Sequence, residues 1–131
     1  MSYRILGAGI DIIEVARVQK QVEGTAGFCQ RVFSPVEIAY CESKRHAAQH
    51  YAARFAAKEA FFKALGTGWR DGMEWREVSV ENNELGRPSL VLSGKAKEVA
   101  AAAGATRLHV SLSHLKEMAC ATVIIETEQT T

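Results

Sequence analysis

The first residue that could do chemistry is Asp11, which interrupts the apolar run Ile10-Asp11-Ile12-Ile13. The run is typical of a strand, where aspartate is disfavoured. Alternation puts Ile10 and Ile12 on one face of that strand and Asp11 on the other. A carboxylate in such a place costs stability unless a cation or hydrogen-bond donors meet it. Asp11 is therefore a candidate metal ligand, although an aspartate that faces water from an edge strand fits this segment equally well.

The second carboxylate is Glu59, on a helix predicted over residues 45–65. At helical spacing Glu59 shares a stripe with Phe55 and Phe62, which indicates the packed face of that helix. Lys63 follows one turn later, within reach of whatever Glu59 binds. A surface ion pair is the ordinary interpretation of this spacing, but the flanking phenylalanines favour a partly buried site. Two carboxylates with a lysine suit magnesium, which also takes water and phosphate oxygens as ligands.

Basic residues are concentrated around the same helix. Residues 44–70 hold a single acid, Glu59, and six basic residues, namely Lys44, Arg45, Arg54, Lys58, Lys63 and Arg70. A local excess of five positive charges in a chain of net charge +1 predicts a small, strongly anionic ligand rather than a nucleic acid. A solvated basic face of the helix is the alternative.

A third candidate is the strand predicted over residues 108–113. Alternation gives His109, Ser111 and Ser113 one common face. Such a polar face can line a ligand pocket, or it can simply face solvent. The pattern does not decide between the two.

Several function classes are excluded or disfavoured. Gly7-Ala8-Gly9 begins like a dinucleotide-binding fingerprint, but Ile12 stands where the third glycine belongs, and no P-loop motif occurs. The chain has three cysteines and no C-x-x-C pair, which disfavours a disulfide framework or a zinc cluster and favours the cytoplasm. The apolar stretch over residues 5–15 is broken by Asp11 and Glu14, so we expect neither a signal peptide nor a membrane span.

The elements that must position these residues form a single domain over residues 1–131. We expect strands over residues 3–15, 78–80, 89–92, 108–113 and 120–126, and helices over 17–22, 34–41, 45–65 and 93–103. Ser34-Pro35-Val36-Glu37 predicts a helix start with a capping box. The order predicts an α+β fold in which an antiparallel sheet packs against the long helix, with the helices on one side.

Five segments resemble the bacterial holo-(acyl carrier protein) synthases, a family of phosphopantetheinyl transferases. They occur in the family's order and are GIDIIEV (9–15), RVFSPVE (31–37), RFAAKEAFFKALGTG (54–68), GRPSL (86–90) and HVSLSH (109–114). The block F-A-x-K-E-A-x-x-K-A within the third segment is highly specific. The stretch over residues 68–77 is the least family-like.

The resemblance implies the phosphopantetheinyl transferase fold and the family's reaction. The 4′-phosphopantetheine group of coenzyme A would pass to a serine of an apo-acyl carrier protein for fatty acid biosynthesis, with adenosine 3′,5′-bisphosphate as by-product. The family's metal ligands match Asp11 and Glu59, and its phosphate-binding lysine matches Lys63. A homotrimer with active sites between subunits is also implied.

From these matches we expect a separate role for each group of residues. Magnesium and Lys63 would neutralise charge that develops on the pyrophosphate, and Glu59 would receive the proton of the attacking serine, directly or through a metal-bound water. For coenzyme A we expect contacts from Lys44, Arg45 and Arg54 at the 3′-phosphate and from His109 and Ser113 in the cleft. Arg17 and Lys20, one turn apart, would dock the acidic carrier protein.

Two other functions remain open. A magnesium-dependent phosphodiesterase would also use carboxylates with a lysine, but it would normally need more acids to hold a second ion. A coenzyme A-binding module without chemistry would not require the metal ligands Asp11 and Glu59.

Overall fold

The computed structural model describes residues 2–70 and 72–129. In chain order its elements are β1 (Ser2–Glu14), α1 (Val15–Gly24), α2 (Phe28–Val32), α3 (Pro35–Glu42), α4 (Ala47–Leu65), the 3-10 turn η1 (Trp75–Glu77), β2 (Val78–Asn82), β3 (Pro88–Leu92), α5 (Gly94–Ala102), β4 (Arg107–His114) and β5 (Met118–Gln129). Every predicted element is present. The short elements α2 and η1 were not predicted.

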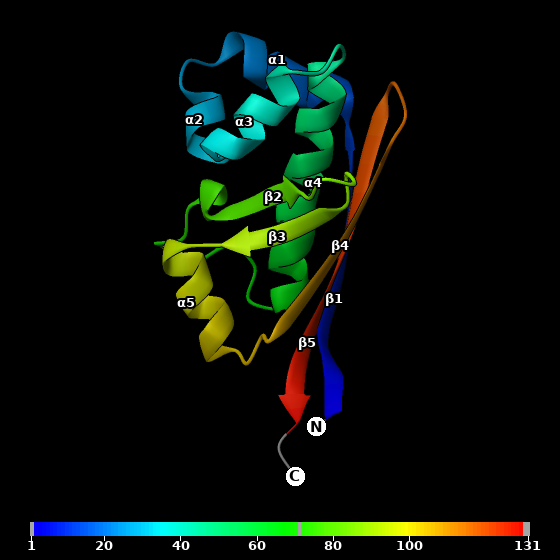
Figure 1. Ribbon diagram of the computed structural model, residues 1–131. Helices are drawn as coiled ribbons and strands as arrows, with labels where there is room; N and C mark the ends of the chain where they lie inside the picture. The colour runs from blue at the N-terminus through cyan, green and yellow to red at the C-terminus, as the bar shows by residue number, and fades with distance from the viewer. Residues whose placement is uncertain (1, 71, 130–131) are drawn as a thin grey trace.

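In the part of the chain that the structure describes, the strands form two separate antiparallel sheets. Strands β1, β5 and β4 form a three-stranded sheet in that order, with β5 in the middle, and β2 pairs only with β3. Helix α4 packs along β1 and β5, while its other sides contact α1, α3 and β2 (Figure 1). The predicted antiparallel sheet against a long helix is confirmed, and the β2–β3 hairpin is an addition that contacts α4 through β2 and β4 through β3.

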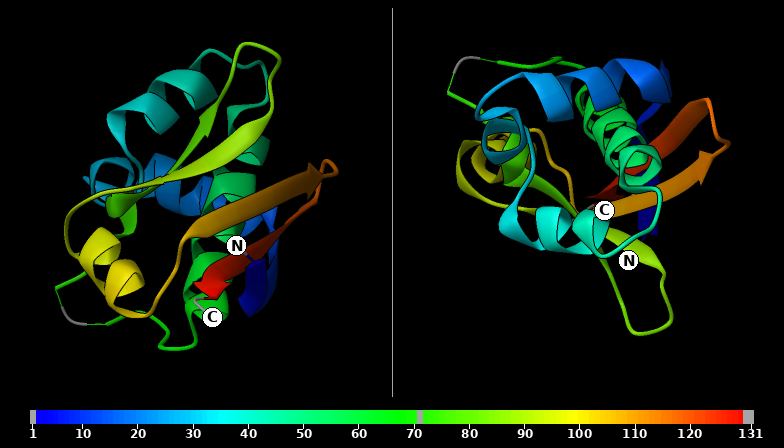
Figure 2. Two further views of the ribbon diagram at one scale, coloured as in Figure 1. Left: turned by 60° about the horizontal axis from the view of Figure 1, so that its bottom comes forward. Right: turned by 90° about the horizontal axis from the view of Figure 1, so that it is seen from above.

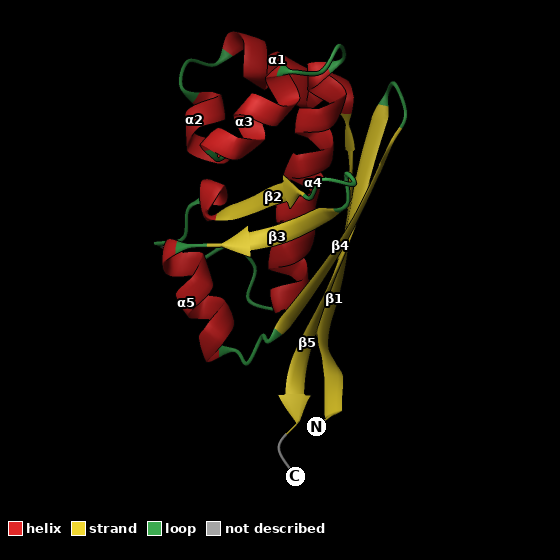
Figure 3. Ribbon diagram, viewed as in Figure 1, coloured by secondary structure: helices red, strands yellow, loops and turns green. Residues whose placement is uncertain are grey.

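Within the described ranges, helices α1 to α5 all lie on one side of the three-stranded sheet (Figure 3), and the view from above shows the same arrangement (Figure 2). On the helix side of the middle strand, Ala121, Val123 and Ile125 are buried. On the outer face of β1, Ile10 and Ile12 are 64% and 65% exposed. Among the described residues no helix is both long and apolar enough to cross a membrane.

Two glycines let β1 lie directly on the backbone of α4. A Cβ atom on Gly7 would stand 1.8 Å from the Ala64 carbonyl oxygen, and one on Gly9 would stand 2.0 Å from that of Ala60. Both helix residues are alanines and are buried. Small side chains on both partners therefore set the distance between the strand that carries Asp11 and the helix that carries Glu59.

Helix α3 starts as the sequence predicts. The Ser34 hydroxyl accepts from the Glu37 amide at 3.2 Å, and the Glu37 carboxylate accepts from the Ser34 amide at 2.9 Å. This reciprocal pair satisfies two amide donors that the first turn of a helix leaves free. It also places Glu37 inside the protein, where it is fully buried.

Candidate active site

Strand β1 and helix α4 bring Asp11 and Lys63 into contact. The Lys63 ammonium group donates to Asp11 Oδ1 and to the Ile10 carbonyl oxygen, both at 3.0 Å. The Asp11 side chain is mostly covered, whereas that of Lys63 is about half exposed. Asp11 therefore faces the helix and not open water. Because Lys63 keeps much of its surface in solvent, its ammonium can also reach an anionic ligand.

Glu59 lies in the electric field of both residues. Burial raises the pKa of its carboxyl above the ordinary value, the nearby Asp11 carboxylate raises it further, and Lys63 opposes the rise. The single lysine thus compensates the two carboxylates only in part. Two like charges held together in partly buried surroundings favour either a proton or a bound cation.

The donor set at this site fits magnesium. Asp11 and Glu59 offer carboxylate oxygens from two elements, and no group of three or more His, Cys, Asp or Glu side chains among residues 2–70 and 72–129 could enclose a metal ion. A dedicated protein cage for zinc or calcium would need more ligands. Magnesium instead accepts one or two carboxylates and completes its shell with water and substrate phosphate.

An aromatic cluster occupies the same face of α4. The indole of Trp75 stacks on Phe55, with ring centroids 5.4 Å apart and an interplanar angle of 12°. It also meets Phe62 edge to face at 5.1 Å. Phe55 was expected beside Glu59, but Trp75 was not, because it comes from the stretch over residues 68–77 that shows no periodic pattern.

A small apolar pocket begins at this aromatic cluster and runs along α1. Its volume is about 110 Å³, and its lining residues come from β1, α1, α2 and α4, namely Ile13, Arg17, Val18, Gln21, Phe28 and Phe55. Of the two cations expected to dock a partner, Arg17 lines this pocket. Lys20 is exposed on the same helix and is not part of the lining.

Of the basic residues expected to bind a phosphate group, Lys44 and Arg45 lie in the turn before α4, and Arg54 lies in the middle of that helix. Lys44 and Arg54 both approach the ring of Tyr40, at 4.8 and 4.0 Å from its centroid. Arg54 is only 2% exposed and donates to Asn82 Oδ1 at 2.6 Å, and its Nε has no partner among the described residues. The alternative of a solvated basic helix face is therefore wrong for Arg54. Arg45 lines a separate groove of about 550 Å³.

His109 and Ser113 lie on the outer face of the sheet. His109 is opposite the exposed Ile124, and its Nε2 lies 2.7 Å from Glu126 Oε1, a carboxylate that also accepts from Arg107. These two partners lower the pKa of Glu126. Within one chain, β4 and β5 separate this face from the Asp11 side. The expected common cleft with Asp11 is therefore not formed by a single subunit.

The chain is similar to known proteins along most of its length. Residues 7–123 match the 4′-phosphopantetheinyl transferase superfamily. The chain is 49% identical to the holo-[acyl-carrier-protein] synthase of Geotalea daltonii over 123 residues, which cover 93% of this chain and 98% of that relative. The acyl carrier protein synthase of Plasmodium yoelii with ADP bound superposes with a TM-score of 0.87 at 30% identity, covering 98% and 100% of the two chains. The Bacillus anthracis holo-(acyl-carrier-protein) synthase in complex with CoA (3′,5′-ADP) gives 0.78 at 33% identity, covering 95% and 98%.

Proposed function

This chain belongs to the 4′-phosphopantetheinyl transferase superfamily, and we propose that its reaction takes place between β1 and α4, around Asp11, Glu59 and Lys63. The chain is a holo-(acyl-carrier-protein) synthase, which transfers the 4′-phosphopantetheine group of coenzyme A to a serine of apo-acyl carrier protein. The main observation in support of this site is that the Asp11 carboxylate of β1 lies close to Glu59 and to the half-exposed Lys63 of α4.

Each of the three residues has a role that its geometry supports. Lys63 can exchange its contact with Asp11 for a contact with a phosphate oxygen of coenzyme A. There it would stabilise the negative charge that develops on the phosphate oxygens as the phosphoanhydride bond breaks. Glu59, whose carboxyl lies beside Asp11 and Lys63, would receive the proton of the attacking serine. Asp11 holds Lys63 in place before the substrate binds.

We propose magnesium as the cofactor, held by Asp11 and Glu59. The fit rests on the two partly covered carboxylates whose charges Lys63 compensates only in part. When bound, the ion would supply a positive charge for the pyrophosphate oxygens.

The remaining coenzyme A contacts are proposals of the same kind. Lys44 and Arg45, in the turn between α3 and α4, would bind the 3′-phosphate, and Arg54 would add its charge from beneath Tyr40.

For the acidic carrier protein, Arg17 at the apolar pocket and Lys20 one turn away would provide the docking surface. A cytoplasmic location and a role in fatty acid biosynthesis stay predictions.

We propose that the protein forms a homotrimer through the outer face of the three-stranded sheet. This face exposes Ile10, Ile12 and Ile124, and large exposed apolar side chains that share one face are typical of an interface. His109 and Ser113 lie on the same face, so a neighbouring subunit could bring them to a cleft that they do not reach in their own chain.

Release of adenosine 3′,5′-bisphosphate separates the three candidate functions. The protein is incubated with coenzyme A and magnesium, with and without an apo-acyl carrier protein, and the nucleotide is quantified by chromatography. A transferase releases the nucleotide only when the carrier is present. Release without a carrier would indicate a phosphodiesterase, and no release in either case would indicate a binding module.

A further inference from the structure

The most completely buried charges in the described part of the protein belong to an ion pair next to the proposed site. Lys58 precedes Glu59 on α4, and its ammonium lies 2.6 Å from Glu37 Oε1, with both side chains 0% exposed. The same ammonium donates to the Trp75 carbonyl oxygen at 3.2 Å and to the Val78 carbonyl oxygen at 2.5 Å. All three of its N–H donors are therefore used. None of the roles assigned above to the reaction involves this pair.

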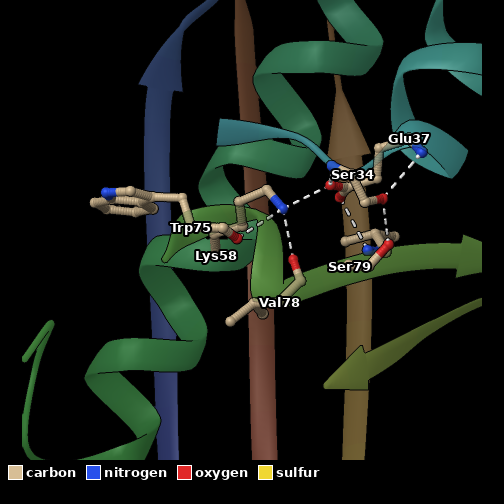
Figure 4. Close-up of polar contacts among 7 residues, drawn as sticks. Ser34, Glu37, Lys58, Trp75, Val78 and Ser79 are labelled. Atoms are coloured by element: carbon tan, nitrogen blue, oxygen red, sulfur yellow. Dashed lines mark hydrogen bonds and ion pairs between the residues drawn. The ribbon is translucent and has the colours of Figure 1, made fainter. Parts of the chain in front are cut away.

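The Glu37 carboxylate is equally saturated. Besides Lys58 it accepts from the Ser34 amide and the Val80 amide, each at 2.9 Å. The Ser34 hydroxyl in turn lies 2.6 Å from that of Ser79 (Figure 4). The pair thus satisfies four main-chain groups, which belong to the N-cap residue of α3, to η1 and to β2. An apolar replacement of both residues would leave those groups without partners, which is costly inside a protein.

This network fixes the main chain at Trp75. Figure 4 shows the Trp75 carbonyl turned toward Lys58, while the indole projects away from the ion pair. The indole ends between Phe55 and Phe62, and it contacts both. These phenylalanines stand four positions before and three positions after Glu59, so the helix surface between them is the one from which Glu59 extends.

We propose that the buried Lys58–Glu37 pair is a positioning device for the active site, because it holds Trp75 against the face of α4 that carries Glu59. Lys58 and Glu37 are positioning residues, and the indole is the wall that they place. The wall restricts the rotamers of Glu59 and excludes water beside it, which strengthens its electrostatic interactions. This role rests on the proposed function of Glu59.

Energetics support a role beyond stability. Removing both charges from water offsets most of the attraction within a buried ion pair, so the attraction itself adds little to stability, although losing one partner alone is costly. The best-attested use of such a pair is to fix one arrangement among alternatives. Here the ion pair fixes the position of Trp75 on α4. Trp75 lies near the end of the stretch over residues 68–77, whose sequence shows no periodic pattern that would fix this position.

The test uses the fluorescence of Trp75 in a Trp69→Phe background, since the chain has only these two tryptophans. In this background we compare Lys58→Met and Glu37→Gln with Lys97→Met, a control at an exposed lysine. Both pair variants should shift Trp75 emission to the red and increase its quenching by acrylamide, and the control should do neither. These spectra are measured on the free protein and remain informative even if no transfer activity is found.

Kinetics with coenzyme A, magnesium and an apo-carrier protein complete the test. Lys58→Met should lower kcat by about 10- to 100-fold, the scale of a misplaced catalytic group, with less than about a threefold change in either KM. Trp75→Ala should reproduce this loss, and Trp75→Phe, which keeps an aromatic ring, should restore most of it. If Lys58→Met does not fold, the two Trp75 variants decide. Full kcat in Trp75→Ala, equal losses in Trp75→Ala and Trp75→Phe, or unchanged Trp75 spectra in a folded Lys58→Met protein would overturn the proposal.

Discussion

Asp11 and Glu59 keep two carboxylates together with only one lysine to balance them. Since the folded-state pKa of Glu59 is raised, its ionisation opposes folding. The folded protein is most stable, with respect to this group, below the ordinary pKa of glutamate, and it loses that stability as pH rises through the raised pKa. At neutral pH without metal, the ionised site therefore destabilises the fold. Sites that destabilise the fold in this way are common where the residues are required for activity.

A bound cation should reverse this effect, which gives the first prediction. In chelator at pH 7, Glu59→Gln should have a higher Tm than the wild type, because it removes a charge from a partly covered site. Added magnesium should raise the Tm of the wild type and leave that of Glu59→Gln nearly unchanged. Differential scanning calorimetry measures both. Equal magnesium effects on the two proteins would contradict the metal assignment.

Both carboxylates of the candidate site could be predicted from the sequence. Asp11 could be singled out because a charge stands in an apolar strand, and Glu59 because it stands between phenylalanines. Trp75 could not, since its place against Phe55 and Phe62 depends on the contact of its own carbonyl oxygen with Lys58 of another element. Arg54 was expected to contact the 3′-phosphate of coenzyme A, and its burial was not predicted. Nothing in its neighbours along the chain predicts its burial against Tyr40 and Asn82.

The pairing of β1 with α4 determines whether the site exists. Gly9 stands so close to the backbone of α4 that an added Cβ would lie 2.0 Å from the Ala60 carbonyl oxygen. A helix backbone cannot move aside as a flexible side chain can. The strand or the helix would therefore shift, and the distance from Asp11 to Lys63 and Glu59 would change.

The second prediction follows from this contact. Gly9→Ala should lower the free energy of unfolding by about 1–3 kcal/mol or more, the usual cost of overpacking. Gly24→Ala is the matched control, because no atom lies within 4 Å of a Cβ at that position. Urea unfolding at equilibrium compares the two. A loss in Gly24→Ala as large as that in Gly9→Ala would mean that the close approach is not the cause.

Elements with strong local signals were predicted, and those set by long-range contacts were not. The start of α3 could be read from Ser34 and Glu37, and α4 from its alanine-rich composition and the terminal Gly66, which adopts a left-handed conformation. Helix α2 has five residues and η1 has three, too short for any periodicity to show. The β2–β3 hairpin forms a sheet of its own that packs on α4 and on β4, and no local pattern encodes this tertiary arrangement.

At the scale of the whole molecule, the outer face of the sheet gives the third prediction. The wild type should sediment at three times the 14.3 kDa mass of one chain. Ile124→Glu should sediment as a smaller species and lose activity, because it puts a charge into the proposed interface. Val91→Glu, on β3, changes a side chain of similar exposure away from this face and should remain trimeric. A fully active wild-type monomer would contradict both the trimer and the cleft between subunits.

Docking of the carrier protein gives the fourth prediction. Arg17→Glu should raise the KM for the carrier by about 10-fold or more, because it reverses a charge at the rim of the apolar pocket. Lys20→Glu, outside the lining, should raise it less, and neither should change coenzyme A affinity. For the wild type, KM should rise with salt, since exposed charges are screened beyond about 8–10 Å at physiological ionic strength. Unchanged carrier kinetics in both variants would place the docking surface elsewhere.

The central claim is that the Asp11–Glu59–Lys63 site moves the phosphopantetheine group onto the carrier. The most direct measurement is the intact mass of an apo-acyl carrier protein after incubation with coenzyme A, magnesium and either the wild type or Glu59→Gln, followed by mapping of the modified residue. We predict that the wild type adds one 4′-phosphopantetheine to a single serine and that Glu59→Gln adds none in the same time. A carrier of unchanged mass after incubation with folded wild-type protein, or full modification by Glu59→Gln, would contradict the account.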